Sequence, residues 1–193
     1  MDKIQLQTDF ALEADDGTVI KCHKYVLAAN CPYFDDLPIN LINQAEVTGY
    51  SGATVSAFVE YLYADKIPPE VMEAVKRQNP DALRRIFPTE KFSLDLLKMA
   101  NQYSVEDLES DCADYLSRTI TSQNAVEFWR SATTLPKSEK KLKEAALQHI
   151  FSVRSIDQIP GFEETFRSPE MVREFVEYTF RKAFLHEVED AIQ

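Results

Sequence analysis

The sequence has 193 residues, of which 45% are hydrophobic, enough for one substantial core or for a core with a smaller satellite. The formal net charge is −11 at pH 7, from 21 lysines and arginines against 32 acidic residues, and such a field repels nucleic acid phosphates and anionic lipid surfaces. An acidic surface favours a partner with a basic face, although it also simply keeps a protein soluble.

The three cysteines, Cys22, Cys31 and Cys112, are an odd and widely spaced set without a Cys-x-x-Cys pair. This pattern predicts reduced thiols, with no zinc site and no redox motif. Cys31 and Cys112 are expected to fill small apolar volumes. The first residues lack the apolar stretch of a secretory signal, and no apolar run approaches the roughly 18 residues of a membrane span. We therefore expect a protein of the cytoplasm, the nucleus or both, with no membrane partner.

The N-terminal segment predicts a β-hairpin over residues 4–22. Apolar residues alternate with polar ones at Ile4, Leu6, Phe10 and Leu12, which is the period of a strand with one buried face. The turn signal Asp15-Asp16-Gly17 follows, because glycine accepts the positive φ that a tight hairpin turn requires.

The next segment changes to helical character. We expect a helix at 26–30, a short helical turn from Pro32, a loop at 35–44, a short third strand at 45–47 and a helix over 53–63. The last of these carries apolar residues at spacings of three and four: Val55, Phe58, Val59, Leu62 and Tyr63. Residues 66–92 contain four prolines and two short charged helical pieces, 70–77 and 81–87, which indicate a surface insertion.

From Ser93 onward the pattern predicts helices almost throughout. Ser93 is expected to cap a helix over 94–103, and Ser104 to start the next one as a capping box. That second helix is expected to bury Val105, Leu108, Cys112, Tyr115, Leu116 and Ile120. Further helices are expected at 122–132, at 136–151, as a short turn at 162–166, and from Ser168-Pro169 to about Leu185. Strands followed by helices predict an α+β domain and then an all-helical one.

Three stretches resemble the BTB/POZ family. Residues 23–34, His-Lys-Tyr-Val-Leu-Ala-Ala-Asn-Cys-Pro-Tyr-Phe, are similar to the family pattern His-Lys-x-Val-Leu-Ala-Ala-x-Ser-Pro-x-Phe, with Cys31 where serine is usual. Residues 58–65 look like the family's Phe-x-x-x-Leu-x-Tyr region, and residues 96–112 look like its Leu-Leu-x-x-Ala-x-x-Tyr helical pair, so that the resemblance covers about residues 8–120.

The resemblance implies a small three-stranded sheet packed on a helical cluster, with a BTB/POZ domain at 1–120 and a helical 3-box and partial BACK-like extension at 121–193. The fold of this family is commonly dimeric. Many members are substrate adaptors that bind cullin-3 in a ubiquitin ligase, whereas others oligomerise without cullin or recruit transcriptional corepressors. We therefore expect a protein-interaction module, either a cullin-3 adaptor or a cullin-independent scaffold, and a possible homodimer.

The resemblance directs attention to one group of candidate partner-binding residues: Leu37, Ile39, Leu41, Ile42, Tyr103, Ser104, Val105, Phe128 and Trp129. Cullin-binding relatives usually carry a longer loop with a hydrophobic-x-Glu motif, but here Glu46 is preceded two places earlier by Gln44. The apolar residues of the loop either enter a partner's pocket or cover this domain's own core. Phe128 and Trp129 are either a recognition hot spot or packing between helices.

No residue pattern indicates catalysis or a cofactor. The four glycines are scattered, so there is no phosphate-binding loop, and the acidic pairs Asp15-Asp16 and Asp35-Asp36 lie in predicted turns, where acids commonly cap. His23 lies at a strand–helix junction, where packing and backbone hydrogen bonding are the expected roles, and it shares no metal-ligand spacing with His149 or His186. We expect no enzyme activity, no cofactor and no metal.

Overall fold

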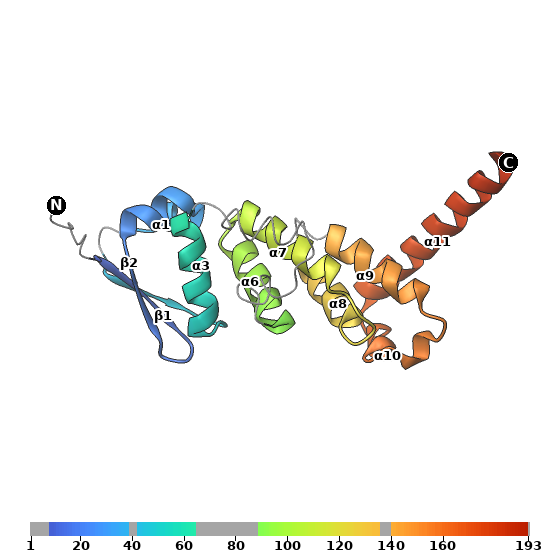
Figure 1. Ribbon diagram of the computed structural model, residues 1–193, viewed down its shortest axis with the longest axis horizontal. Coiled ribbons are helices and arrows are strands. Elements are labelled where there is room, and N and C mark those ends of the chain that lie inside the picture. Colours follow the sequence, from blue (N-terminus) through green and yellow to red (C-terminus); the bar gives the residue numbers. More distant parts are fainter. Residues whose placement is uncertain (1–7, 39–41, 65–88, 136–139, 193) are drawn as a thin grey trace. The chain divides into compact units, whose positions relative to one another are not determined.

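A computed structural model describes residues 8–38, 42–64, 89–135 and 140–192 of the chain (Figure 1). Its contacts form two compact units, Met1–Cys112 and Ala113–Gln193, and the division falls inside helix α7 (Glu106–Arg118). The predicted domain boundary after residue 120 stays a prediction. The two helical pieces predicted at 70–77 and 81–87 lie outside the described residues.

The first unit contains a three-stranded sheet. Strand β1 (Phe10–Ala14) pairs antiparallel with β2 (Val19–Cys22) and parallel with β3 (Gln44–Val47), so the strand order is β2-β1-β3. The hairpin is confirmed over residues 10–22, and its turn contains Gly17 with a φ of 76°. The predicted strand positions 4–7 lie outside the described residues. Phe10, Leu12 and Ala14 are buried on one face, as the alternation predicts.

The hairpin turn is fastened to the helix that follows the sheet. The carboxylate of Asp16 accepts hydrogen bonds from the backbone N–H of Thr18 at 3.0 Å and of Gly52 at 2.8 Å. Gly52 begins α3 (Gly52–Ala64), and a Cβ atom there would overlap the side chain of Thr18. The close approach of the turn and the helix therefore requires glycine at position 52.

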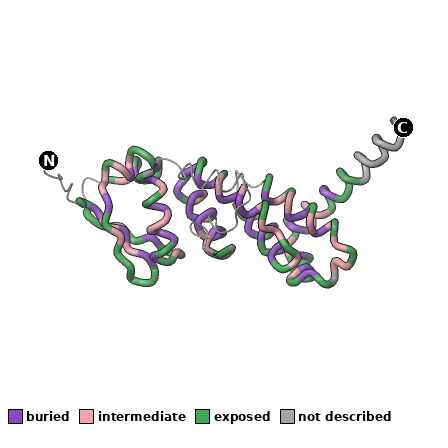
Figure 2. The backbone as a smooth tube through the Cα atoms, in the orientation of Figure 1, coloured by how far each residue is buried: buried purple, intermediate pink, exposed green. Residues whose placement is uncertain are grey.

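Helices complete the first core, and α3 packs on strands β1 and β2 of the sheet. The helices are α1 (Lys24–Asn30), α2 (Pro32–Asp36), α3, α6 (Glu90–Gln102) and the first part of α7. The large side chains that are almost fully buried include Leu12, Leu27, Phe34, Phe58, Leu62, Leu97 and Met99. Buried positions recur along the strands and helices of this unit (Figure 2). The fold is thus the predicted α+β arrangement, a small sheet packed on helices.

The start of α6 differs from the prediction. The helix begins at Glu90, inside the predicted insertion, and its cap is Thr89, whose hydroxyl accepts from the N–H of Phe92 at 3.1 Å. Ser93 is a buried residue within the helix, and its hydroxyl donates to the carbonyl of Thr89 at 3.1 Å. The capping role predicted for Ser93 was therefore wrong by one helical turn.

Ser104 ends α6 and does not cap α7. Its φ is 58°, and its N–H donates to the carbonyl of Asn101 at 3.1 Å, while the N–H of Val105 donates to the carbonyl of Ala100 at 2.9 Å. This pair of bonds is a Schellman motif, in which the left-handed residue is usually glycine. The capping box predicted at Ser104 was wrong because the residue is already engaged in closing the preceding helix.

The buried face predicted for α7 is confirmed at Leu108, Cys112 and Leu116. Ile120, by contrast, lies beyond the last residue of this helix and is only partly buried.

The second unit is helical throughout its described part. After α7 come α8 (Ala125–Thr134), α9 (Lys140–Ser152), the 3-10 turn η1 (Ile156–Gln158), α10 (Phe162–Thr165) and α11 (Pro169–Ile192). The last helix is longer than predicted. No helix in the described residues combines the length and the apolar character that crossing a membrane requires.

Candidate protein-interaction surface

An aromatic cluster lies where α2 meets the end of α6. The ring of Tyr103 stacks on Phe34 with centroids 5.6 Å apart, and it meets the edge of Tyr33 at 4.8 Å and the tilted ring of Phe58 at 5.4 Å. Tyr103, Phe34 and Phe58 are buried, whereas Tyr33 is 45% exposed. The cluster therefore connects the core of the first unit to its surface through one tyrosine.

A hydrogen bond ties this cluster to the turn before α2. The thiol of Cys31 donates to the carbonyl oxygen of Tyr103 at 3.3 Å. Burial, together with the neighbouring Tyr33, Tyr50 and Cys31, raises the pKa of the Tyr103 hydroxyl to about 12. The Tyr103 phenol is consequently neutral at physiological pH, and its ring packs in the core of the first unit.

The other predicted residues near this cluster have different environments. Ser104 is exposed, while Val105 is buried with 7% of its surface accessible. Leu37 and Ile42, at the two ends of the predicted loop, are each partly buried. Ile39 and Leu41 lie outside the described residues. Tyr103, Ser104 and Val105 are thus contiguous with the exposed Tyr33, and only Ser104 among these three presents much of its surface.

Sequence reasoning missed Tyr33 as a surface candidate. The signal was present in the pattern Cys-Pro-Tyr-Phe. Phe34 lies on a short helix and is buried in the core of the unit, so the adjacent Tyr33 must point in another direction. Two further tyrosines of the first unit are exposed, Tyr25 at 61% and Tyr63 at 45%. The ring of His23 lies between them, with centroid distances of 5.8 Å and 5.9 Å.

His23 is engaged with Tyr63. The hydroxyl oxygen of Tyr63 accepts from the backbone N–H of His23 at 2.7 Å, and it lies 2.6 Å from Nδ1 of the same residue. Within the described parts of the chain no group of three or more histidine, cysteine or acidic side chains is arranged to hold a metal ion. The position of His23 agrees with the packing and hydrogen-bonding role expected from the sequence.

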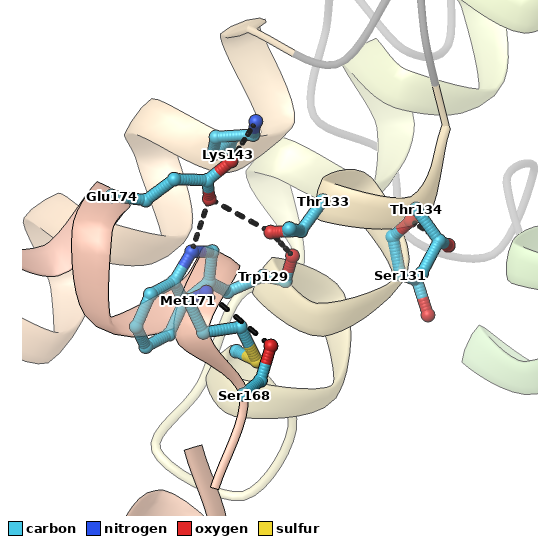
Figure 3. A network of polar contacts seen from close by, with 8 residues as sticks. All are labelled: Trp129, Ser131, Thr133, Thr134, Lys143, Ser168, Met171 and Glu174. Carbon is cyan, nitrogen blue, oxygen red and sulfur yellow. Dashed lines mark hydrogen bonds and ion pairs between the residues drawn. The ribbon is translucent and has the colours of Figure 1, made fainter. Parts of the chain in front are cut away.

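Phe128 and Trp129 are buried in the second unit, with 1% and 0% of their surface accessible. The indole Nε1 of Trp129 donates to Oε2 of Glu174 on α11 at 3.0 Å (Figure 3). This burial supports the packing alternative for both residues in the chain as it stands.

Glu174 is the centre of a polar network that fastens α11 to α8 and α9 (Figure 3). Besides Trp129, the hydroxyl of Thr133 donates to its Oε2 at 2.8 Å and the ammonium of Lys143 to its Oε1 at 2.6 Å. Burial by itself would raise the pKa of this carboxyl, but the three hydrogen bonds outweigh burial and hold the pKa of Glu174 below its ordinary value. Sequence reasoning missed this residue.

The first unit packs a small sheet on helices, a helical extension follows it, and an exposed tyrosine rests on buried aromatic rings. This is the arrangement expected from the sequence for a protein-interaction module. The sequence model of the BTB/POZ domain matches residues 1–120, and the chain belongs to this family.

Relatives include Kelch-like protein 8 of Mus musculus, which is 24% identical over 166 residues, covering 69% of this chain and 26% of the relative. BTB/POZ domain-containing protein At1g21780 of Arabidopsis thaliana is 26% identical over 154 residues, covering 77% of this chain and 41% of the relative. Protein maternal effect lethal 26 of Caenorhabditis elegans is 23% identical over 170 residues, covering 84% of this chain and 38% of the relative. The chain thus spans well under half the length of these relatives.

Proposed function

We propose that the chain is a substrate adaptor that binds the N-terminal helices of cullin-3 in a ubiquitin ligase. Membership of the BTB/POZ family supports the class of function. The observation that carries the proposal is the half-exposed ring of Tyr33, which rests on Tyr103 at 4.8 Å beside the exposed Ser104. A rigid aromatic on a packed base is the kind of residue that supplies most of the energy in a protein interface.

The proposed surface consists of Tyr33, of Leu37 and Ile42 at the two ends of the predicted loop, and of the junction at Tyr103 and Ser104. Ile39 and Leu41 enter the proposal from the sequence alone. The loop lacks a hydrophobic-x-Glu motif, and Glu46 is an exposed residue of β3. In the proposal the apolar contact comes from Leu37 and Ile42, which are partly exposed, together with Tyr33. The helices predicted at 122–151, observed as α8 and α9, are the proposed 3-box.

A titration of the purified chain with a cullin-3 N-terminal fragment tests the proposal. We expect binding, and we expect Tyr33→Ser to weaken it at least about tenfold, as loss of an interface anchor does. Tyr25→Ser is the matched control, because it removes another exposed tyrosine, which lies on α1. Absence of binding by the wild-type chain at concentrations of tens of micromolar would reject the adaptor function.

A second candidate is cullin-independent self-association, with or without recruitment of a transcriptional corepressor. The observation in its favour is the exposed aromatic group of Tyr25 and Tyr63 on either side of His23. Exposed apolar groups of this kind mark interaction sites. Light scattering distinguishes the candidates: a stable oligomer that Tyr25→Ser dissociates, without affinity for cullin-3, supports the second one.

In either case we expect the protein to act in the cytoplasm, the nucleus or both, and to bind proteins and not nucleic acid or membranes. The net charge of −11 supports this expectation, since it opposes binding to phosphate-rich surfaces.

A further inference from the structure

Four carboxylates lie within a few residues of Tyr33 or Tyr103 in the chain. Asp35 and Asp36 follow Tyr33 on α2, and Glu106 and Asp107 open α7 after Ser104 and Val105. All four side chains are exposed. Because the ring of Tyr33 contacts that of Tyr103 at 4.8 Å, both acidic pairs belong to segments that meet at one aromatic contact within the first unit.

Several acidic residues elsewhere in this unit have structural tasks. Asp9 accepts from the backbone N–H of Lys24 at 2.9 Å, and Asp15 accepts from that of Gly49 at 2.7 Å. Glu109 is buried and accepts from the amide of Asn101 at 2.6 Å. These carboxylates therefore stabilise turns and helix packing.

The carboxylates beside Tyr33 differ from these. Within the described part of the chain, Asp35 and Asp36 make no ion pair and no side-chain hydrogen bond. Glu106 and Asp107 favour the start of α7 through the helix dipole, but Asp36, as the last residue of α2, gains nothing in this way. The surface thus concentrates negative charge that the described fold does not neutralise.

We propose that this surface docks a basic polypeptide segment, one that places an apolar side chain against Tyr33 and flanks it with lysine or arginine. An apolar side chain gains from covering the exposed part of the Tyr33 ring, and flanking cations gain from the carboxylates of the neighbouring residues. This inference deepens the proposed function by stating the chemistry of the partner, and its test uses a probe that does not depend on cullin-3.

The probe is a pair of synthetic helical peptides with leucines at spacings of three and four, one with lysines beside the leucines and a twin with glutamates in their place. The isotope-labelled chain is titrated with each peptide and followed by NMR. We expect the lysine peptide to shift the amide signals of residues 33–37 and 103–107, and the glutamate peptide to leave them unchanged.

The matched variants separate this surface from the general acidity of the chain. Asp35→Asn with Asp36→Asn is expected to weaken the lysine peptide about fivefold, the size that two exposed ion pairs give. Glu60→Gln with Glu163→Gln makes the same change in net charge on α3 and α10, and less than a twofold change is expected. Equal effects of the two double variants, or shifts that avoid residues 33–37 and 103–107, overturn the inference.

The cullin-3 titration separates this inference from the proposed function. One outcome is that cullin-3 binds and that neither added salt nor the double variant Asp35→Asn with Asp36→Asn weakens the binding. This outcome overturns the basic-partner inference and leaves the adaptor function standing. Site-specific binding of the lysine peptide without any binding of cullin-3 supports this inference and rejects the adaptor function.

Discussion

The thiol of Cys31 and the carbonyl oxygen of Tyr103 are hydrogen-bonded at 3.3 Å although 72 positions separate them in the chain. Tyr103 is the residue that closes α6, and carbonyl groups at the end of a helix have no partner within the helix itself. The bond therefore satisfies a helix end and at the same time holds the turn before α2 against it. Four predictions follow from this and related contacts.

The thiols of the folded chain are expected to be unreactive. All three cysteines are buried, and burial raises the pKa of the Cys31 thiol. Burial, together with the nearby Asp9, raises the pKa of the Cys22 thiol to about 11. Burial also raises the pKa of Cys112. At pH 8 a disulfide reagent should react slowly with the native protein and rapidly with all three thiols in denaturant. Rapid labelling of Cys31 in the native protein would contradict this.

Replacement of Tyr103 should distinguish its ring from its hydroxyl. Tyr103→Ala removes a ring that contacts Tyr33, Phe34 and Phe58, and should lower the free energy of unfolding by about 3–5 kcal/mol. Tyr103→Phe keeps the ring and should cost less than about 1 kcal/mol. Urea denaturation measures both. A large effect of the phenylalanine variant would show that the hydroxyl, and not the packing, carries the stability.

Ser104→Gly should stabilise the first unit. Ser104 has a φ of 58°, a left-handed conformation that costs a residue with a Cβ atom about 1–2 kcal/mol. Part of the gain is offset by the greater freedom of glycine in the unfolded chain, so a net increase of about 0.5–1 kcal/mol is expected. Ser104→Ala keeps the strain and is the control. A destabilised glycine variant beside an unchanged alanine variant would disprove this account.

Glu174 should make the second unit sensitive to acid. Its pKa is lowered in the folded state from an ordinary value of 4.5, so its stabilising effect is complete above pH 4.5 and is lost as the pH falls through the lower folded value. Glu174→Gln removes the charge that pairs with Lys143 and should cost about 1–2 kcal/mol at pH 7.

The pH dependence of this variant provides the check. The difference in melting temperature between the wild-type chain and Glu174→Gln should be large at pH 7 and should shrink below pH 4.5, because the wild-type carboxyl then becomes protonated as well. A difference that stays constant between pH 7 and pH 3 would contradict the assigned ionic role.

The sequence was sufficient for the features that depend on neighbouring residues. The Asp-Gly turn and the alternation around Phe10 and Leu12 predicted the hairpin, and the spacing of Phe58 and Leu62 predicted α3, because these signals act over a few positions. The cap of α6 was misplaced because Thr89 and Ser93 are both residue types that favour caps, and only the hydrogen bond to Phe92 distinguishes them.

Contacts between distant segments were beyond local patterns. The parallel pairing of β1 with β3 and the meeting of Tyr33 with Tyr103 depend on the path of the whole chain. Glu174 lies 45 positions from Trp129 in the sequence, and a single acid on a helix gives no sign of its partners. Its one available signal was its position beside Phe175 on a helix that also carries Met171 and Tyr178, an apolar setting for a carboxylate.

Asp16 gives the hairpin turn a constraint that exposed turns seldom have. Hairpin tips are ordinarily the places where inserted residues or affinity tags are accommodated. Here one carboxylate holds both the return of the hairpin and the first residue of α3, and the side chain of Thr18 leaves no space at Gly52. An insertion between Asp16 and Thr18 would consequently disrupt the hairpin turn and also separate it from the start of α3. This turn is therefore an unsuitable site for tagging or for circular permutation.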